Sequence, residues 1–325
     1  MAELLLEVTD LSVRFDTDDG PVHAVDKLSF SLGRSEVLGI VGESGCGKSV
    51  TCMSLVRLLP ETASIRGSAV FEGTDLLSLS PRRLRAVRGR DISFVFQEPM
   101  TSLNPVLKIG RQIGEVLTKH LGASRREARA RTIELLQLVR IPSPEQRLDD
   151  YPHQLSGGMR QRVMIAMALA CDPKVLIADE PTTALDVTIQ AGVLDLMRDI
   201  RERLGTSIIL ITHNLGVVAD IADRVVVMYA GRKAEEAPVH ELFAEPQHPY
   251  TIGLMGAIPR PHAQDGERPR LREIPGRVPS LRELPSMCAF AERCPRADEL
   301  SRSQVPELRL VRPDHLVACF HPGPE

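Results

Sequence analysis

A chain of 325 residues, 43% hydrophobic and 26% charged, can form one large globular domain with an appendage. Its net charge of −3 at neutral pH lacks the strongly basic character expected of a nucleic-acid-binding protein. The longest apolar stretch, residues 163–171, is about half as long as a membrane-spanning helix, and Met1-Ala2-Glu3 lacks the basic start of a signal peptide, so we expect neither feature.

A phosphate-binding loop follows the first strongly predicted strand. Residues 36–41 form an apolar run typical of a buried strand, and the next eight residues read Gly-Glu-Ser-Gly-Cys-Gly-Lys-Ser. Glycines let successive backbone N–H groups point at phosphates, and the helix that follows presents its positive end. We expect Lys48 to reach the β- and γ-phosphates of ATP and the Ser49 hydroxyl to bind Mg²⁺. The candidate ATP-binding residues here are Gly42, Glu43, Ser44, Gly45, Cys46, Gly47, Lys48, Ser49 and Val50.

A second motif, Leu155-Ser156-Gly157-Gly158-Met159, predicts a helix start that faces an anion. Ser156 is of a residue type that caps helices, and the helix would begin near Gly157. Its first N–H groups have no partner within the helix and carry the positive end of the helix dipole. This segment is therefore a candidate for binding phosphate.

Residues 174–180 form another apolar run that ends in two carboxylates, Asp179 and Glu180. The carboxyl ends of parallel strands are where open α/β sheets place their ligands. Asp179 would hold Mg²⁺, and Glu180 would orient or deprotonate the attacking water. A solvated turn is the alternative, which the phosphate loop upstream disfavours.

Three further polar residues complete a recognisable order. Gln97 follows the strand-like residues 92–96, Asp186 closes Ala184-Leu185-Asp186, and His213 follows the strand-like residues 207–212. In this order, over about residues 4–240, the chain resembles the nucleotide-binding subunit of an ABC transporter. The resemblance implies an α/β fold, that of a P-loop NTPase with an ABC-type core and an inserted helical subdomain at about residues 98–165.

The resemblance also implies roles for individual residues. Gln97 would sense the γ-phosphate and Mg²⁺, and His213 would contact the γ-phosphate, so that both join Glu180 as catalytic residues. Phe15 would stack on adenine. Mg²⁺ would be held through Ser49, Gln97 and Asp179.

In the same family two subunits meet head to tail and close around two nucleotides. The residues that would face the partner's nucleotide or the dimer interface are Ser156, Gly157, Gly158 and Asp186. Because the chain has one phosphate loop and one such motif, it supplies half of each site. Asn214 stands where these proteins usually carry Asp, and its effect is left open by the sequence.

The composition changes after residue 245. Eight prolines between residues 246 and 285 predict an extended tail without regular secondary structure. We therefore divide the chain into an ATPase domain, 1–245, and an extension, 246–325. Motifs such as His248-Pro249-Tyr250-Thr251 and Arg293-Cys294-Pro295 resemble the small, irregular Pro/Cys-rich C-terminal extension of oligopeptide and dipeptide importer ATPases, especially the first of their two ATPase subunits.

The tail cysteines suggest three alternatives. The related proteins usually carry four cysteines here that hold an iron–sulfur cluster, whereas this chain has Cys288, Cys294 and Cys319, with Ser301 at the fourth position. Zinc held by the three thiolates and His315 or His321 is the second alternative. Three reduced cysteines without a metal are the third.

These features together predict an ATP-hydrolysing motor subunit of an ABC importer for oligopeptides or dipeptides, with ATP and Mg²⁺ as cofactors. Its partners would be a second, similar ATPase, two transmembrane permease subunits and, indirectly, an extracytoplasmic substrate-binding protein, with no nucleic acid. It would act at the cytoplasmic face of the cell membrane. The alternative is a soluble ABC ATPase of translation or DNA repair, which the single cassette and the absence of a sustained heptad pattern disfavour.

Overall fold

The computed structural model describes residues 3–97, 102–183, 186–257, 273–282 and 286–323. It contains two compact units. The first unit comprises residues 1–3, 32–37 and 78–211, and the second comprises residues 4–31, 38–77 and 212–325. Each unit is therefore assembled from several separate segments of the chain.

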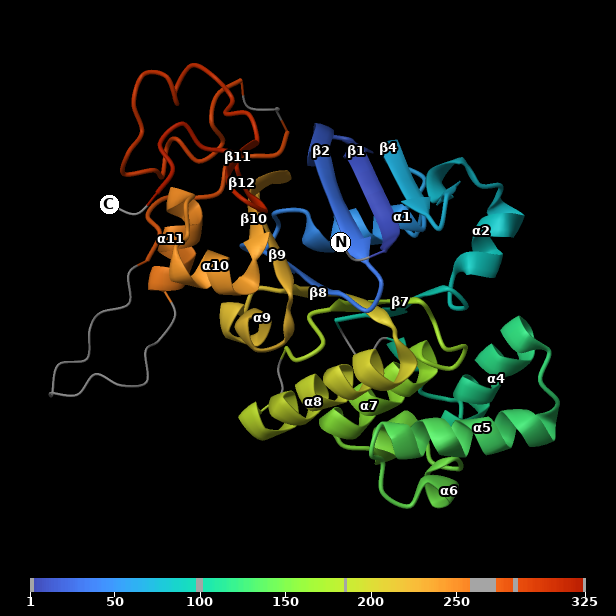
Figure 1. Cartoon of the computed structure of the whole chain (residues 1–325). Helices are drawn as coiled ribbons and strands as arrows, with labels where there is room; N and C mark the ends of the chain where they lie inside the picture. Colours follow the sequence, from blue (N-terminus) through green and yellow to red (C-terminus); the bar gives the residue numbers. More distant parts are fainter. Residues whose placement is uncertain (1–2, 98–101, 184–185, 258–272, 283–285, 324–325) are drawn as a thin grey trace, which may run out of the picture. The chain divides into compact units, whose positions relative to one another are not determined.

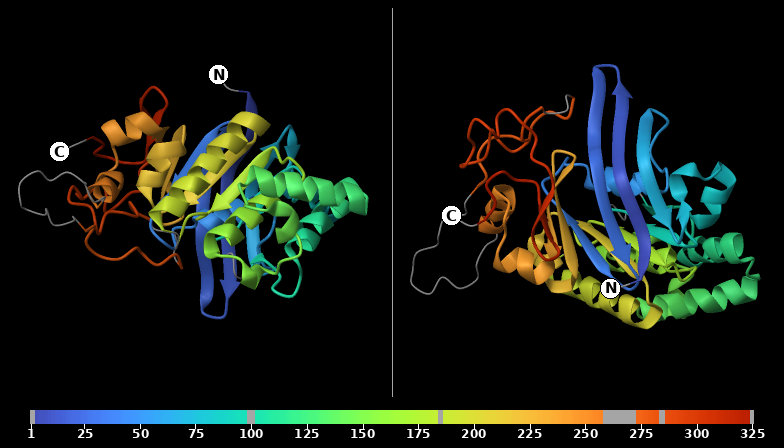
Figure 2. Two further views of the ribbon diagram at one scale, coloured as in Figure 1. Left: turned by 90° about the horizontal axis from the view of Figure 1, so that it is seen from below. Right: turned by 45° about the horizontal axis from the view of Figure 1, so that its top comes forward.

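The second unit contains an antiparallel sheet and a group of strands around β3. In the antiparallel sheet the order is β2-β1-β4-β5, and β1 and β2 form one long hairpin (Figure 2). Around β3, the strand β9 is parallel to β3, β10 is antiparallel to β9, and β12 is antiparallel to both β10 and β11. The strands are β1 (Leu4–Thr17), β2 (Gly20–Gly33), β3 (Val37–Val41), β4 (Ala63–Phe71), β5 (Thr74–Asp75), β9 (Arg224–Tyr229), β10 (Arg232–Pro238), β11 (Arg309–Arg312) and β12 (His315–Val317). The helices are α1 (Lys48–Leu55), α9 (Leu215–Ile221), α10 (Val239–Ala244) and α11 (Pro249–Gly256).

The described residues of the first unit form three parallel strands and a group of helices. β7 pairs with β6 on one side and with β8 on the other, both in parallel. Within the helical group, α4 and α5 lie side by side (Figure 1). The strands are β6 (Ile92–Val95), β7 (Val175–Asp179) and β8 (Ser207–Thr212). The helices are α2 (Pro81–Val87), α4 (Ile109–Leu121), α5 (Arg125–Leu138), α6 (Pro144–Arg147), α7 (Gly157–Ala168) and α8 (Val187–Leu204).

The apolar runs of the sequence correspond to the buried strands of the structure. β3, β7 and β8 are buried at every position, which is expected of parallel strands that are covered on both faces. The helical region predicted at 98–165 contains α4, α5, α6 and most of α7, while residues 98–101 lie outside the described part of the chain. Among the helices that the structure describes, none is both long and apolar enough to cross a membrane.

The tail is more regular than its prolines predicted. Pro249 is the first residue of α11, where the missing N–H of proline removes no hydrogen bond of the helix, and its fixed φ suits a helix. His248 caps this helix. The expectation of no regular structure between residues 246 and 285 is therefore wrong for α11. Farther along, β12 pairs with β10 and joins the tail to the strands of the second unit.

His248 should make the stability of the protein depend on pH. It is 3% exposed and its Nδ1 accepts a hydrogen bond from Tyr250 N at 3.0 Å. Burial lowers the pKa of His248 to about 4, against about 6.5 in an unfolded chain. Between these values the unfolded state binds more protons, so we expect the free energy of unfolding to fall by about 3 kcal/mol as pH drops from 6.5 to 4.

Urea denaturation at several pH values would measure this dependence. His248→Asn keeps an oxygen that can cap α11 and removes the titrating ring, so the loss of stability in this pH range should become smaller. His240→Asn, at an exposed histidine of α10, is the matched control and should leave the pH dependence unchanged. The prediction would be contradicted if the free energy of unfolding fell equally steeply with decreasing pH in the natural chain and in His248→Asn.

Candidate functional site

The phosphate loop lies between β3 and α1. Gly42, Gly45 and Gly47 all have positive φ, of 152°, 79° and 98°. A Cβ on Gly42 would overlap the carbonyl oxygen of Met228, and a Cβ on Gly47 would overlap that of Ala24. Glycine is therefore required at both positions by backbone conformation and by close packing.

Lys48 lies folded back on the loop that it follows. It is 6% exposed, and its Nζ donates hydrogen bonds to Gly42 O at 2.8 Å and to Glu43 O at 3.0 Å. Its neighbour Cys46 is buried, which raises the pKa of the thiol. Carbonyl oxygens of the loop thus accept the hydrogen bonds of the ammonium group. When a nucleotide binds, its phosphate oxygens can replace these carbonyl oxygens as acceptors.

In the first unit, the carboxyl ends of β6 and β7 bring two of the three predicted catalytic residues together, Gln97 and Glu180. Val95 and Ala178 are paired in register, so Gln97 and Asp179 follow at the same edge. Glu180 Oε2 accepts a hydrogen bond from Gln97 Nε2 at 2.9 Å. A second hydrogen bond, from Thr183 Oγ1, reaches the same oxygen at 2.8 Å. The Glu180 carboxylate is therefore oriented by two neighbours.

The backbone at Glu180 is in an unusual conformation. Its φ is +47°, in the left-handed region, and its N–H donates to Ile211 O at 2.8 Å. Such a conformation in a residue other than glycine is unfavourable and is concentrated at functional sites. It supports the reading of this strand end as a site rather than an ordinary solvated turn.

The predicted anion-facing helix start is present as α7. Ser156 is its N-cap, and Ser156 Oγ accepts from Met159 N at 3.3 Å. A Cβ on Gly157 would meet nothing within 4 Å, so this side of the helix start is open. On Gly158, by contrast, a Cβ would lie 2.8 Å from Ile189 Cγ2 of α8. Gly158 thus permits α7 and α8 to approach closely.

Asp186 and Asn214 have clear local roles as helix caps. Asp186 Oδ1 accepts from Ile189 N at 2.9 Å at the start of α8. Asn214 Oδ1 accepts from Gly216 N at 2.9 Å at the start of α9, directly after His213. An amide oxygen caps a helix as well as a carboxylate does, so Asn214 retains the capping function of an Asp.

Phe15 lies on β1, opposite Ala63 of β4. It is partly exposed, unlike the fully buried aromatic residues of the core. This partial exposure is consistent with the predicted contact with adenine.

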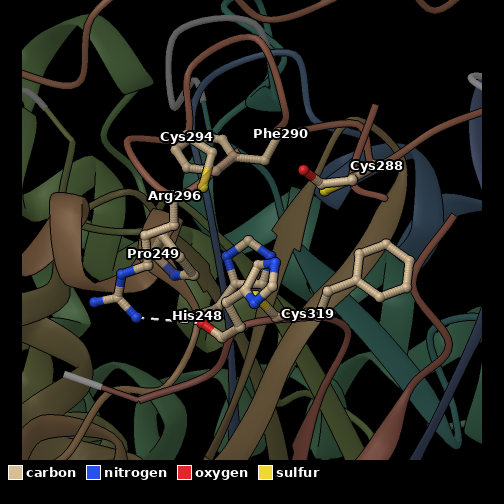
Figure 3. A pocket seen from close by; sticks show the side chains of 10 residues that line it. His248, Pro249, Cys288, Phe290, Cys294, Arg296 and Cys319 are labelled. Atoms are coloured by element: carbon tan, nitrogen blue, oxygen red, sulfur yellow. Dashed lines mark hydrogen bonds between the residues drawn. The ribbon is translucent and has the colours of Figure 1, made fainter. Parts of the chain in front are cut away.

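The three tail cysteines and Ser301 line one small cavity of about 10 Å³ (Figure 3), about the space that one water molecule requires. The Ser301 hydroxyl lies 2.8 Å from Asp298 Oδ1, and Ser301 Oγ accepts from Asp298 N at 2.7 Å. Burial raises the pKa of the cysteine thiols, that of Cys319 to about 11. His321 Nε2 lies 2.9 Å from Asp298 Oδ2, and His315 Nε2 lies 2.7 Å from Glu235 Oε1.

Comparisons with known proteins agree with this geometry. Residues 25–183 match the family model described as ABC transporter, and residues 234–300 match that described as oligopeptide/dipeptide transporter, C-terminal region. A probable peptide ABC transporter ATP-binding protein of Sinorhizobium fredii is 53% identical over 98% of this chain and 95% of its own length. The oligopeptide transport ATP-binding protein OppD of Salmonella typhimurium is 50% identical over 100% of this chain and 96% of its own length.

The chain belongs to the family of ABC transporter ATP-binding proteins. Among solved structures, a dimeric ATP-binding cassette in a post-hydrolysis state, bound to ADP and Pi, aligns with a TM-score of 0.65 at 26% identity, over 72% of this chain and 99% of that one. The predicted fold, an ABC-type ATPase core, is thereby confirmed, and ATP is the nucleotide that this ABC ATPase hydrolyses.

The donor groups of the ABC ATPase suit Mg²⁺. Asp179 and Gln97 offer carboxylate and amide oxygens at one sheet edge, and oxygen ligands are those that Mg²⁺ prefers. Gln97 binds Glu180 through its nitrogen, so its Oε1 is the atom that could face a metal ion. Ser49, the third predicted ligand, lies in the first turn of α1.

The cavity of the tail, by contrast, does not fit an iron–sulfur cluster or zinc as it stands. It has room for about one water molecule, which is less than an iron–sulfur cluster needs, and the Ser301 hydroxyl is already hydrogen-bonded to Asp298. Within the described part of the chain, no three side chains of His, Cys, Asp or Glu are grouped so that they could hold a metal ion.

Two sets of residues at the site were not found from the sequence. Thr183 orients Glu180, and a hydroxyl three residues after a carboxylate is too common to stand out. Tyr250 and Arg293 of the tail contact Glu43 in the phosphate loop, more than 200 positions away. A pairing over such a distance leaves no local pattern in one sequence.

Proposed function

We propose that this protein is the ATP-hydrolysing subunit of an importer for oligopeptides or dipeptides, acting at the cytoplasmic face of the membrane. The proposal rests on one observation: the same chain contains an ABC ATPase domain and a C-terminal region of the oligopeptide/dipeptide transporter type. Its relatives over nearly the whole length are described as peptide transport proteins. Two permease subunits, a second ATPase and a substrate-binding protein would complete the transporter.

In this proposal each residue has a step in the ATP cycle. Lys48 leaves the loop carbonyls and binds the β- and γ-phosphates, whose negative charge Mg²⁺ helps to neutralise when bound. Glu180, oriented by Gln97 and Thr183, accepts a proton from the attacking water. His213 contacts the γ-phosphate, and Phe15 stacks on adenine.

Dimerisation would complete the active sites. The open start of α7 at Ser156, Gly157 and Gly158 would bind the γ-phosphate held by the partner, and Asp186 would lie at the same interface. The dimeric cassette among the structural relatives supports this arrangement. A second, similar ATPase is the partner that we propose, since the tail resembles that of importers with two different ATPase subunits.

Co-purification and transport assays would test the proposal. The tagged full chain, isolated from its own membranes in mild detergent, should bring two membrane subunits and a second ATPase, identified by mass spectrometry. After reconstitution with the binding protein, addition of a peptide should raise ATP hydrolysis in the natural complex and not in one carrying Glu180→Gln. Recovery with ribosomal or DNA-repair proteins would instead support the alternative function.

Iron content should depend on residue 301. We propose that the Ser301–Asp298 pair occupies the place of the missing cysteine ligand and prevents cluster assembly, so the natural chain, purified without oxygen, should contain only traces of iron and sulfide. Ser301→Cys supplies a fourth thiol at the cavity and should raise both, because thiolates are the usual cluster ligands. Ser303→Cys, on a nearby exposed residue, is the control and should not. Stoichiometric iron and sulfide in the natural chain would contradict this prediction.

A further inference from the structure

Arg293, from the tail, forms a partly buried ion pair with Glu43 of the phosphate loop. Its Nη1 and Nη2 donate to the two carboxylate oxygens of Glu43 at 2.6 and 2.9 Å. The Arg293 side chain is 4% exposed and that of Glu43 is 28% exposed. A bidentate ion pair of this kind fixes both the position and the orientation of the Glu43 carboxylate, and solvent screens its electrostatic attraction only weakly.

The position of Arg293 is itself fixed by the tail. Its Nε donates to Pro275 O at 2.8 Å and its Nη2 donates to Ile274 O at 3.2 Å. Its guanidinium carbon lies 5.7 Å from the ring centre of Tyr229 and 5.9 Å from that of Phe290. Arg293 therefore reaches Glu43 from a rigid setting rather than from a flexible surface.

A second contact of the tail holds the backbone of the same loop residue. The N–H of Glu43 donates to the Tyr250 hydroxyl at 2.8 Å. Tyr250 is fully buried, and its ring centre lies 4.6 Å from that of Tyr229. The carbonyl oxygen of Glu43 in turn accepts from Lys48 Nζ at 3.0 Å. A continuous chain of contacts thus runs from Arg293 through Glu43 to the lysine of the phosphate loop.

We propose that Arg293 and Tyr250 are positioning residues through which the C-terminal extension sets the affinity of the phosphate loop for nucleotide. With Glu43 held by its side chain and by its N–H, the loop keeps its shape without nucleotide, and less order is lost when phosphates bind. The inference rests on the proposed role of residues 42–49 as the phosphate-binding loop.

Binding of ADP and AMP to the purified full chain would test this inference. ADP has the β-phosphate that the loop would bind, AMP lacks it, and neither needs the dimer to be closed. The variants are Arg293→Gln, Arg293→Lys, Glu43→Gln, Tyr250→Phe and the double variant Glu43→Gln/Arg293→Gln. Arg282→Gln is the matched control, because Arg282 is an exposed tail arginine whose ion-pair partner is Asp19 and not a residue of the phosphate loop.

Removing the pair should weaken ADP binding by about tenfold and leave AMP binding within about twofold. Arg293→Lys should be intermediate, because an ammonium cannot form the fork. Tyr250→Phe should weaken ADP binding by about threefold, and Arg282→Gln should not weaken it. In the double variant the loss should be smaller than the product of the two single losses, as expected for residues that act through each other.

Several outcomes would overturn the inference. Unchanged ADP affinity in folded Arg293→Gln and Glu43→Gln would overturn it. Equal losses of affinity for ADP and for AMP would also overturn it. If Arg293→Gln does not fold, Glu43→Gln alone gives the test, since Glu43 lies on the partly exposed loop. Lys48→Ala separates the two proposals. If Lys48→Ala leaves ADP binding unchanged, the phosphate-loop assignment fails. If Lys48→Ala weakens ADP binding and the Arg293 and Glu43 variants do not, only the role of the tail is overturned.

Discussion

Replacing Glu180 with glutamine should abolish ATP turnover while ATP still binds. Glutamine keeps the size of the side chain and an oxygen that can accept from Thr183, but it cannot take a proton from water. General bases contribute about 10²-fold to 10⁴-fold to rate, so we expect turnover to fall at least about 100-fold. Phosphate release at saturating ATP would measure the rate, and equilibrium binding of ATP would measure the affinity.

An exposed glutamate provides the control for this experiment. Glu202→Gln makes the same chemical change on the surface of α8 and should leave turnover as it is. Mixed with the proposed partner ATPase, the Glu180 variant should also accumulate as an ATP-bound dimer, visible by light scattering, because the hydrolysis expected to reopen the dimer is lost. Substantial residual turnover in Glu180→Gln would show that another group accepts the proton.

Short motifs allowed much of this site to be predicted from the sequence. The phosphate loop, the acidic end of β7 and the helix start at Ser156 each depend on a few neighbouring residues and on local backbone chemistry. Glycine at 42 and 47 is required by positive φ and close packing. The strand ends also follow from the sequence, since continuous apolar runs of five or six residues mark buried parallel strands.

Other features depend on contacts that no local pattern records. Arg293 meets Glu43 across 250 positions. The helix α11 forms although prolines surround it, because Pro249 falls at its first turn and His248 caps it. The resemblance to proteins with four cysteines in this tail suggested a metal site, but Ser301, at the position of the fourth cysteine, is hydrogen-bonded to Asp298. In each case the role of the residue depends on its contacts in the folded chain and cannot be inferred from its amino-acid type alone.

Removing the ammonium group of Lys48 should weaken nucleotide binding strongly. In the structure Lys48 Nζ donates to two loop carbonyls, and on binding it would exchange these neutral acceptors for charged phosphate oxygens. Hydrogen bonds to charged groups are worth about 1.5–3 kcal/mol, so Lys48→Ala should raise the Kd for ATP by roughly 10-fold to 150-fold.

Calorimetric titration with ATP would measure this change, and Lys119→Ala, at an exposed lysine in the last turn of α4, should show none. The thermal midpoint separates the two possible effects of Lys48→Ala. Since Lys48 also ties the loop together, some loss of stability is expected without nucleotide, but a loop role alone would lower stability and leave the Kd unchanged. A raised Kd in a variant that melts near the natural midpoint would assign Lys48 to the phosphates, and unchanged affinity would count against the phosphate-loop reading of residues 42–49.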